Sequence, residues 1–193
     1  MSNFFAMVGR MKQIERWALM RNAFTENIAE HSQNVAVIAH ALCIIGNKKF
    51  GKNYNAERAA VLAMFHDTTE VITGDMPTPV KYYNDEIKSV YKDIERIAGE
   101  RLLNMLPEEF KEDYVPMFEK QKEDEDLWKI VKAADKIDAL IKCIEESRMG
   151  NKEFEKALQI QQQKIDEIDM PEVKYFKEEF LPAYYLTLDE HTK

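Results

Sequence analysis

Hydrophobic residues recur three and four positions apart along most of the chain, which is the spacing of an amphipathic helix. Residues 4–14 predict a first helix, and the polar, less regular residues 16–26 predict a bend or loop. A second helix is predicted from Asn27, because Glu30 completes a capping box three residues later. Gly46 predicts its end. Its buried stripe consists of Val35, Ile38, Ala39, Leu42 and Ile45.

The middle of the chain continues this pattern. Asn55 predicts the cap of a third helix that runs through HDTTEVIT to Gly74. Pro77 and Pro79 exclude a regular helix in the segment DMPTPVKYY and predict a rigid, extended loop there. A helix over about residues 85–105 follows, and Pro107 predicts the start of a shorter one.

The last third of the chain also has helical spacing. Residues 124–149 predict a long amphipathic helix with an acidic start and a stop at Gly150. Residues 151–190 predict one helix and a shorter one after Pro171. No internal repeat or linker interrupts the sequence, and strand-type alternation is almost absent. We therefore predict an all-α fold, with residues 1–193 forming a single compact domain.

Composition fits this prediction and narrows the function. With 45% hydrophobic and 32% charged residues the balance is that of a folded protein, and only 6 Gly and 6 Pro favour helices. The net charge of −8 argues against nonspecific binding to a nucleic-acid polymer, which depends on many Lys and Arg contacts to phosphates. A small phosphate-bearing substrate remains compatible, because one metal ion or one local positive site suffices.

The two cysteines, Cys43 and Cys143, fall inside helical patterns far apart in the sequence, which predicts buried free thiols and a reducing compartment. The N-terminal residues lack the long apolar core of a signal peptide. No apolar run approaches the ~20 residues that span a bilayer. We therefore expect the cytoplasm and no membrane contact.

Candidate chemistry centres on two of the four histidines, His31 and His66. Asp67 follows His66 directly, and neighbours on a helix point about 100° apart, so the two can share a metal only across the edge between them. Imidazole nitrogen with carboxylate oxygen suits Mn, Co, Fe, Ni or Zn better than calcium. Glu70 lies one turn further along, where a carboxylate can orient a ligand or exchange a proton.

A His-Asp pair alone is also what a solvated helix edge contains. Phe65 and the alanine-rich run before it predict burial, however, and a buried carboxylate requires a metal or another cation. Asp135 has the same requirement, since it lies in the apolar stretch 131–140, and Asp138 one turn on is a rival ligand.

The remaining polar features predict less. His40 falls on the helix face opposite His31 and is interpreted as structural, and His191 is assigned no role. Lys81 is either a surface lysine or a phosphate contact. The charged run 119–126 predicts a solvated loop and a helix start.

The order His31, His66-Asp67, Asp135 resembles the H…HD…D signature of the HD-domain phosphohydrolase superfamily. Four segments resemble the bacterial 5′-deoxynucleotidase family more closely, and the resemblance extends over roughly residues 4–190. They are RWALMRN (16–22), TENIAEHS (25–32), HDTTEVITGDMPTPVKY (66–82) and KAADKIDALIKC (132–143). The stretch TGDMPTPVKY, combined with the upstream EHS and HD, is a far more specific pattern than the His-Asp pair alone.

The resemblance implies an HD-domain helical fold. It also implies homodimers that remove phosphate from deoxyribonucleoside 5′-monophosphates with a divalent transition metal, Co²⁺ or Mn²⁺ being effective. The implied metal ligands are His31, His66, Asp67 and Asp135. The implied substrate contacts are Arg16, Trp17, Asp75, Met76, Pro77 and Thr78, together with the ligands His31, Asp67 and Asp135. The implied catalytic acidic group is Glu70.

These implied roles are chemically reasonable. Arg16 can bind phosphate bidentately and stabilise its developing charge. The bulk of Trp17 beside C2′ can disfavour a 2′-hydroxyl. Asp75 can accept a hydrogen bond from the sugar or, in place of Glu70, handle the leaving-group proton, and the sequence does not decide between these two carboxylates. Without the resemblance, Arg16 is better interpreted as a surface residue and Trp17 as a core or edge aromatic.

Two alternative functions remain open. One is hydrolysis of a cyclic nucleotide or a nucleoside triphosphate, against which the sequence offers no obvious basic segment for three phosphates. The other is a non-catalytic helical binding module with a vestigial metal site. Apolar residues in 154–190 are the candidate interface of the expected homodimer.

Overall fold

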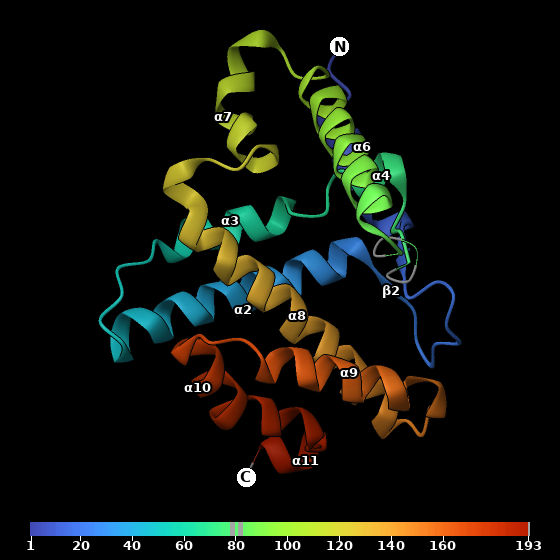
Figure 1. Cartoon of the computed structure of the whole chain (residues 1–193), viewed down its shortest axis with the longest axis vertical. Helices are drawn as coiled ribbons and strands as arrows, with labels where there is room; N and C mark the ends of the chain where they lie inside the picture. The colour runs from blue at the N-terminus through green and yellow to red at the C-terminus, as the bar shows by residue number, and fades with distance from the viewer. Residues whose placement is uncertain (78–79, 81–82, 193) are drawn as a thin grey trace.

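Two long helices, α2 (Ile28–Lys49) and α8 (Glu125–Arg148), cross at the centre of the molecule (Figure 1). The computed structural model describes residues 1–77, 80 and 83–192. Helix α3 (Ala56–Phe65) packs against both long helices. Their facing sides form the main hydrophobic core, whose fully buried members include Val35, Leu42, Leu62, Ile130, Leu140 and Ile144.

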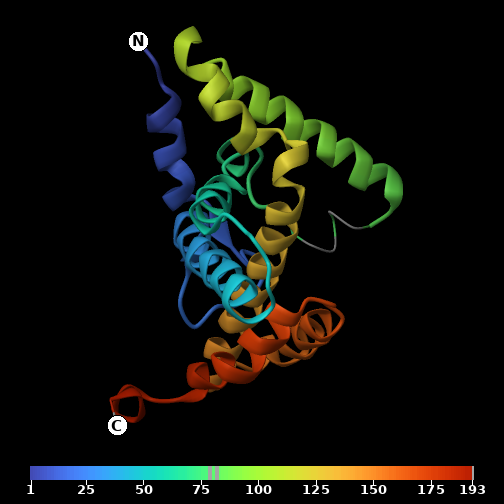
Figure 2. The ribbon, with the colours of Figure 1, turned by 90° about the vertical axis from the view of Figure 1, so that its left-hand side faces the viewer.

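Shorter helices cover the two ends of this centre (Figures 1 and 2). At one end α1 (Phe4–Val8), α6 (Asp85–Leu103) and α7 (Glu108–Phe118) enclose a second core of Phe4, Leu102, Leu103 and Leu106. At the other end lie α9 (Glu155–Asp166), α10 (Pro171–Glu179) and α11 (Leu188–His191). The chain termini consequently lie at opposite ends of the long axis. The 3₁₀ turns are η1 (Gly9–Gln13), η2 (Lys122–Asp124), η3 (Lys152–Phe154) and η4 (Leu181–Tyr185).

The all-helical prediction is confirmed, and most predicted helix limits agree with the structure to within two residues. The predicted first helix over residues 4–14 is an exception, because α1 ends at Val8 and the chain continues as the 3₁₀ turn η1. The Asn27 capping box forms, because the Asn27 side chain accepts from the Ala29 and Glu30 amides while Glu30 accepts from the Asn27 amide. Pro107 caps α7, and Gly150 follows α8 with a φ of 78°. The two cysteines are buried free thiols, as predicted.

The predicted stop at Gly46 is wrong, because α2 continues through this glycine to Lys49. A Cβ on Gly46 would lie 2.8 Å from Cε2 of Tyr54, so the missing side chain permits close packing of that ring. The turn that ends the helix comes at Gly51, which has a φ of 64°. By length and composition α2 could span a membrane, but 56% of its most apolar window is buried inside the protein, as in a core helix.

The predicted third helix is also wrong in one respect, because it breaks where its chemistry lies. Helix α3 ends at Phe65, a tight turn follows, and α4 (Glu70–Thr73) begins after it. Backbone hydrogen bonds from Thr68 to Phe65 and from Glu70 to Asp67 span three residues instead of four. Gly74, with a φ of 73°, ends α4 and donates its N–H to the Glu70 carbonyl.

The segment predicted to be a loop, 16–26, is flanked by two short paired strands. β1 (Glu15–Arg16) and β2 (Glu26–Asn27) are antiparallel, with Arg16 opposite Glu26. Strands of two residues are too short for alternation to be visible in the sequence. Within the predicted proline-containing loop, Asp75–Pro77 are not helical, as predicted, but Val80 is helical. Thr78, Pro79, Lys81 and Tyr82 lie outside the described residues.

Candidate active site

The imidazoles of the buried His31 and the half-buried His66 face one another at the centre of the site. His31 lies in the first turn of α2 and His66 at the end of α3, with ring centroids 5.1 Å apart. His66 Nδ1 lies 2.7 Å from the Ala63 carbonyl, which can only accept, so this nitrogen carries the proton. His31 Nδ1 lies 2.6 Å from Asp138 Oδ2. Neither Nε2 has a hydrogen-bond partner among the described residues, so both are candidate ligand atoms.

Two carboxylates converge on these nitrogens. Asp67 Oδ2 lies 3.4 Å from His31 Nε2 and 3.2 Å from His66 Nε2, and Asp135 Oδ1 lies 3.2 Å from His31 Nε2. The structure thus brings together all four predicted metal ligands, from α2, the α3–α4 turn and α8. Two imidazole nitrogens with two carboxylate oxygens are a suitable donor set for a divalent transition metal.

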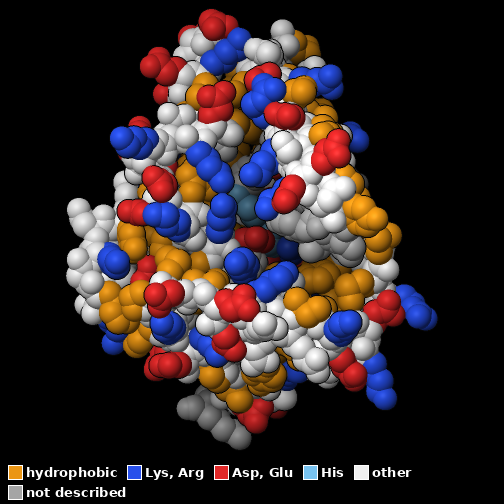
Figure 3. Space-filling model, in the orientation of Figure 1, with side chains coloured by type: hydrophobic (Ala, Val, Ile, Leu, Met, Phe, Trp, Pro, Cys, Tyr) orange, Lys and Arg blue, Asp and Glu red, His pale blue; other side chains and the backbone are white. Residues whose placement is uncertain are grey.

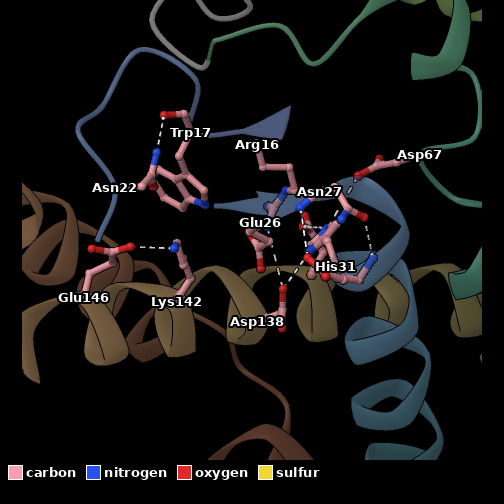
Figure 4. Close-up of polar contacts among 12 residues, drawn as sticks. Arg16, Trp17, Asn22, Glu26, Asn27, His31, Asp67, Asp138, Lys142 and Glu146 are labelled. Carbon is pink, nitrogen blue, oxygen red and sulfur yellow. Dashed lines mark hydrogen bonds and ion pairs between the residues drawn. The ribbon is translucent and has the colours of Figure 1, made fainter. Parts of the chain in front are cut away.

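Asp138, the rival ligand, lies on the other side of His31. Its side chain is buried and its Oδ2 faces Nδ1, away from the other donors (Figure 4). A carboxylate in this position fixes the imidazole tautomer and leaves Nε2 free for a metal. The three-residue spacing between Asp135 and Asp138 places both on one face of α8, and that spacing alone does not tell which of them reaches Nε2.

The charges around the histidines favour cation binding. Burial and the nearby Arg16 oppose protonation of His31, but the adjacent carboxylates of Asp135, Asp138 and Asp67 outweigh them and raise its pKa. Burial alone would raise the pKa of Asp67, yet His66 and His31 hold it well below its usual range. Asp135 is not buried as the sequence predicts, because 41% of its side chain is exposed. Its partial desolvation opposes ionisation, but His31 outweighs this effect and lowers the pKa of the Asp135 carboxyl. Two ionised carboxylates therefore surround the imidazoles.

Arg16 extends this network toward the opposite side. Its Nη1 lies 2.6 Å from Glu26 Oε2 and 3.7 Å from Asp138 Oδ2. Burial disfavours its charge, but Glu26, Asp135 and Asp138 together raise the pKa of the guanidinium, so it remains a cation. Glu26 was not predicted, because it becomes the partner of Arg16 only through the β1–β2 pairing.

Trp17 follows with an unusual backbone. Its φ of 57° is the one positive value at a non-glycine residue among the described residues, and for a bulky side chain such a conformation is strained. Its carbonyl accepts hydrogen bonds from the Met20 amide at 2.8 Å and Asn22 Nδ2 at 3.2 Å. Its ring packs 5.5 Å from that of Phe154. Strain of this kind is typical of functional positions.

A buried ion pair anchors the loop that carries Trp17. Lys142 Nζ donates to Glu146 Oε1 at 2.5 Å and to the Phe24 carbonyl at 2.7 Å. Glu146 Oε2 accepts from the Ala23 amide at 2.8 Å and from Asn151 at 2.7 Å. Figure 4 shows the contact between Glu146 and Lys142. These contacts fix Ala23 and Phe24, at the end of this loop, to α8. No local pattern in the sequence predicts them.

The remaining predicted residues lie on the next segment. Glu70 is buried as the first residue of α4, and Asp75, Met76 and Pro77 are half-buried just after Gly74. Thr78 lies outside the described residues. His40 is exposed on α2, and His191 is exposed in α11. The face that Figure 3 shows is hollowed at its centre, with acidic side chains at the floor and many Lys and Arg side chains around the rim.

This fold is that of the HD-domain phosphohydrolases. An HD-domain phosphohydrolase from Listeria innocua is 25% identical, with a TM-score of 0.83 over 99% of this chain and 92% of that chain. A cyanophage S-2L HD phosphohydrolase bound to dA and one catalytic Zn²⁺ shares the fold, with a TM-score of 0.65 at 17% identity over 94% of this chain and 96% of that one.

Sequence relatives narrow this class. Residues 3–184 match the family described as 5′-deoxynucleotidase YfbR-like. A 5′-deoxynucleotidase of Vibrio vulnificus is 53% identical over 189 residues, 98% of this chain and 97% of that protein. One of Shewanella oneidensis is 50% identical over 193 residues, 100% of this chain and 99% of that protein. The chain therefore belongs to the YfbR-like 5′-deoxynucleotidase family, which confirms the predicted family and the predicted class of phosphoric monoester hydrolase.

Proposed function

We propose that this chain hydrolyses deoxyribonucleoside 5′-monophosphates to deoxynucleosides and phosphate, with a divalent metal held by His31, His66, Asp67 and Asp135. The observation that carries the proposal is the pair of buried Nε2 atoms, each left free by a hydrogen bond at Nδ1, next to two carboxylates. A bound divalent cation supplies phosphate charge neutralisation and a lowered pKa for water. We propose Co²⁺ or Mn²⁺, and the Zn²⁺ of the cyanophage protein supports a divalent metal more generally.

Arg16 is proposed to bind the phosphate. Its guanidinium stays charged and is held by Glu26, so a bidentate contact to phosphate oxygens costs little further ordering of the side chain. Such a cation stabilises charge that develops on the phosphate oxygens in the transition state.

Glu70 and Asp75 are the two candidates for the proton that the leaving 5′-oxygen takes up. Glu70 is buried beside the His66–Thr69 turn, while Asp75 is half-buried in the loop that follows. Glu70→Gln and Asp75→Asn variants separate the roles, because only loss of the proton donor removes one limb of the pH–rate profile. The other carboxylate is then expected to change KM.

Trp17 is proposed to select the sugar. Its strained backbone fixes the indole beside Arg16, whose guanidinium carbon lies 6.0 Å from the ring centroid. The bulk of the ring in that position disfavours a 2′-hydroxyl. Asp75, Met76, Pro77 and Thr78, together with the ligands His31, Asp67 and Asp135, complete the proposed substrate contacts.

The test is release of phosphate from dAMP, dTMP and dUMP by protein loaded with Co²⁺ or Mn²⁺, compared with the corresponding ribonucleotides. We expect hydrolysis of the deoxynucleotides and little of the ribonucleotides. Asp135→Ala is expected to abolish metal binding and activity together. Failure of the metal-loaded protein on every deoxynucleotide would refute the proposal. A monophosphate product from a cyclic nucleotide, or inorganic triphosphate from a triphosphate, would favour the alternative reactions.

We further propose a cytoplasmic homodimer. Several apolar side chains in the C-terminal third are exposed in this chain, and they support an interface there: Ile160, Phe180, Tyr185 and Leu188. Light scattering after size exclusion is expected to give twice the chain mass of 22.6 kDa. A monomer at micromolar concentration would contradict this.

A further inference from the structure

A hollow of about 450 Å³ lies where the linker after α7 meets the first two turns of α8. Four lysines line it, and we call it the lysine pocket: Lys120, Lys122, Lys129 and Lys132. Glu125 is the one carboxylate among its lining residues, and Trp128 forms part of its wall. This concentration of positive charge occurs in a chain whose net charge is −8.

Most of this charge is uncompensated. Lys129 pairs with Asp126 at 2.8 Å and with Glu125 at 3.6 Å, whereas no ion pair with a described residue involves Lys120, Lys122 or Lys132. The other charged groups that face Lys120 are Lys92 and Glu95 of α6. Burial, Lys132 and Lys92 lower the pKa of Lys120, and Glu95 opposes them more weakly. Like charges held together in this way are relieved by an anion.

The lysine pocket lies next to the proposed metal centre, but none of the four proposed metal ligands lines it. Lys132 precedes Asp135 by three residues, a rise of about 4.5 Å along the helix. Asp138, Lys142 and Glu146 follow in the opposite direction and support Arg16 and the Trp17 loop. The lysine pocket therefore adjoins the candidate active site on the side away from Arg16 and Trp17.

We propose that the lysine pocket binds a phosphate anion at a site separate from the metal centre. Lysine ammonium groups are point donors with three protons each, which suits phosphate oxygens from several directions. Trp128 is only 9% exposed, and Lys120 Nζ lies 5.2 Å above its ring, so the ring offers no free face for a nucleobase. The pocket recognises phosphate groups, either a free phosphate or the polyphosphate chain of a nucleotide.

The test is calorimetric titration of the metal-loaded chain with inorganic phosphate and with tripolyphosphate at low ionic strength. Removing two lysine contacts in the double variant Lys120→Gln/Lys132→Gln is expected to weaken binding of at least one probe about tenfold or more. The matched control is Lys174→Gln/Lys177→Gln, which removes equal charge from lysines already paired with Asp169 and Asp166. The control is expected to bind as the wild type does.

The outcomes distinguish the two sources of phosphate. If the double variant loses binding of inorganic phosphate, the ligand of the pocket is free phosphate. If it loses binding of tripolyphosphate alone, the ligand is a polyphosphate chain. Equal affinities of wild type and double variant for both probes would overturn the proposal, as would an equal loss in the control. Metal content is measured after each titration to verify that it is the same in every variant. Phosphate binding at the metal centre then contributes equally to all of the curves. The readout is binding, so it does not depend on the proposed hydrolysis.

Discussion

Asp138 Oδ2 lies 2.6 Å from His31 Nδ1, on the edge of the imidazole away from the Asp67 and Asp135 carboxylates. Through this contact one buried carboxylate sets the tautomer of a proposed metal ligand. We expect Asp138→Asn to weaken metal affinity about 10–100-fold, the usual effect of losing such a partner. Competition with a chelator measures it.

The control for this prediction is Asp126→Asn, which removes an exposed carboxylate from the same helix. Its metal affinity is expected to equal that of the wild type. If Asp138→Asn retains full affinity, Asp138 does not orient the ligand.

Trp17→Ala removes the ring that is proposed to exclude a 2′-hydroxyl. The ratio of kcat/KM for dTMP over its ribose counterpart is expected to fall about tenfold or more, since steric discrimination is worth about 1–3 kcal/mol. Trp17→Phe keeps an aromatic ring against Phe154 and is expected to lose less. An unchanged ratio in Trp17→Ala would remove Trp17 from sugar recognition.

Glu146→Gln leaves Lys142 buried without its anion, and breaking a buried pair costs about 3 kcal/mol or more of the free energy of unfolding. Burial opposes ionisation of Glu146, but bonds from Lys142, the Ala23 amide and Asn151 outweigh it and lower its pKa. A depressed carboxyl pKa stabilises the fold above the unfolded value of about 4.3 and loses that effect as the pH falls through the folded pKa.

Urea denaturation at several pH values tests this linkage. The stability gap between wild type and Glu146→Gln is expected to be widest near pH 7 and to narrow below about pH 4.3. A gap that is constant across this range would show that the Glu146 charge does not contribute.

Gly46→Ala is predicted to lower the free energy of unfolding, and Gly99→Ala is predicted to raise it. Alanine gains about 1 kcal/mol over glycine inside a helix. At Gly46 the new Cβ would lie 2.8 Å from the Tyr54 ring, whose backbone is held by Asn47, and overpacking costs about 1–3 kcal/mol. At Gly99 the nearest atom, Phe118 Cβ, lies at 3.4 Å, an ordinary contact.

Thermal melts therefore should place Gly46→Ala below and Gly99→Ala above the wild type. Stabilisation by both changes would mean that the Tyr54 ring shifts at little cost.

Cys43 and Cys143 are predicted to be unreactive in the folded protein. Burial raises the pKa of each thiol to about 12, so the nucleophilic thiolate is scarce at pH 8. A disulfide reagent is expected to label neither cysteine before denaturant is added and both afterwards. Rapid labelling of the native chain would show that α2 or α8 opens locally.

The long helices could be predicted from the sequence because their signals are local: the Asn27 capping box, the spacing of the apolar stripe, and Gly150. The break at His66–Thr69 could not, since HDTTEVIT carries no glycine or proline and tertiary packing of the buried Thr68 decides it. The helix stop predicted at Gly46 is wrong because a local signal was followed where tertiary packing decides. The close packing of the Tyr54 ring requires a glycine inside the helix.

The same distinction applies to the site. The four proposed metal ligands come from the resemblance to a known motif, and the structure places their side chains close together. Contacts between distant segments were missed: Glu26 with Arg16, and Lys142 with the loop before β2. The lysine pocket could not be predicted from the sequence for the same reason, because Lys92 and the lysines of 120–132 approach one another only in the folded chain.

The donors around His31 come from segments separated by as many as 104 positions in the chain. In the unfolded chain these atoms are far apart, so a cation that prefers the assembled set shifts the folding equilibrium by mass action. Metal supply to the cell would then set how much of this enzyme survives proteolysis, as well as how fast each surviving copy works.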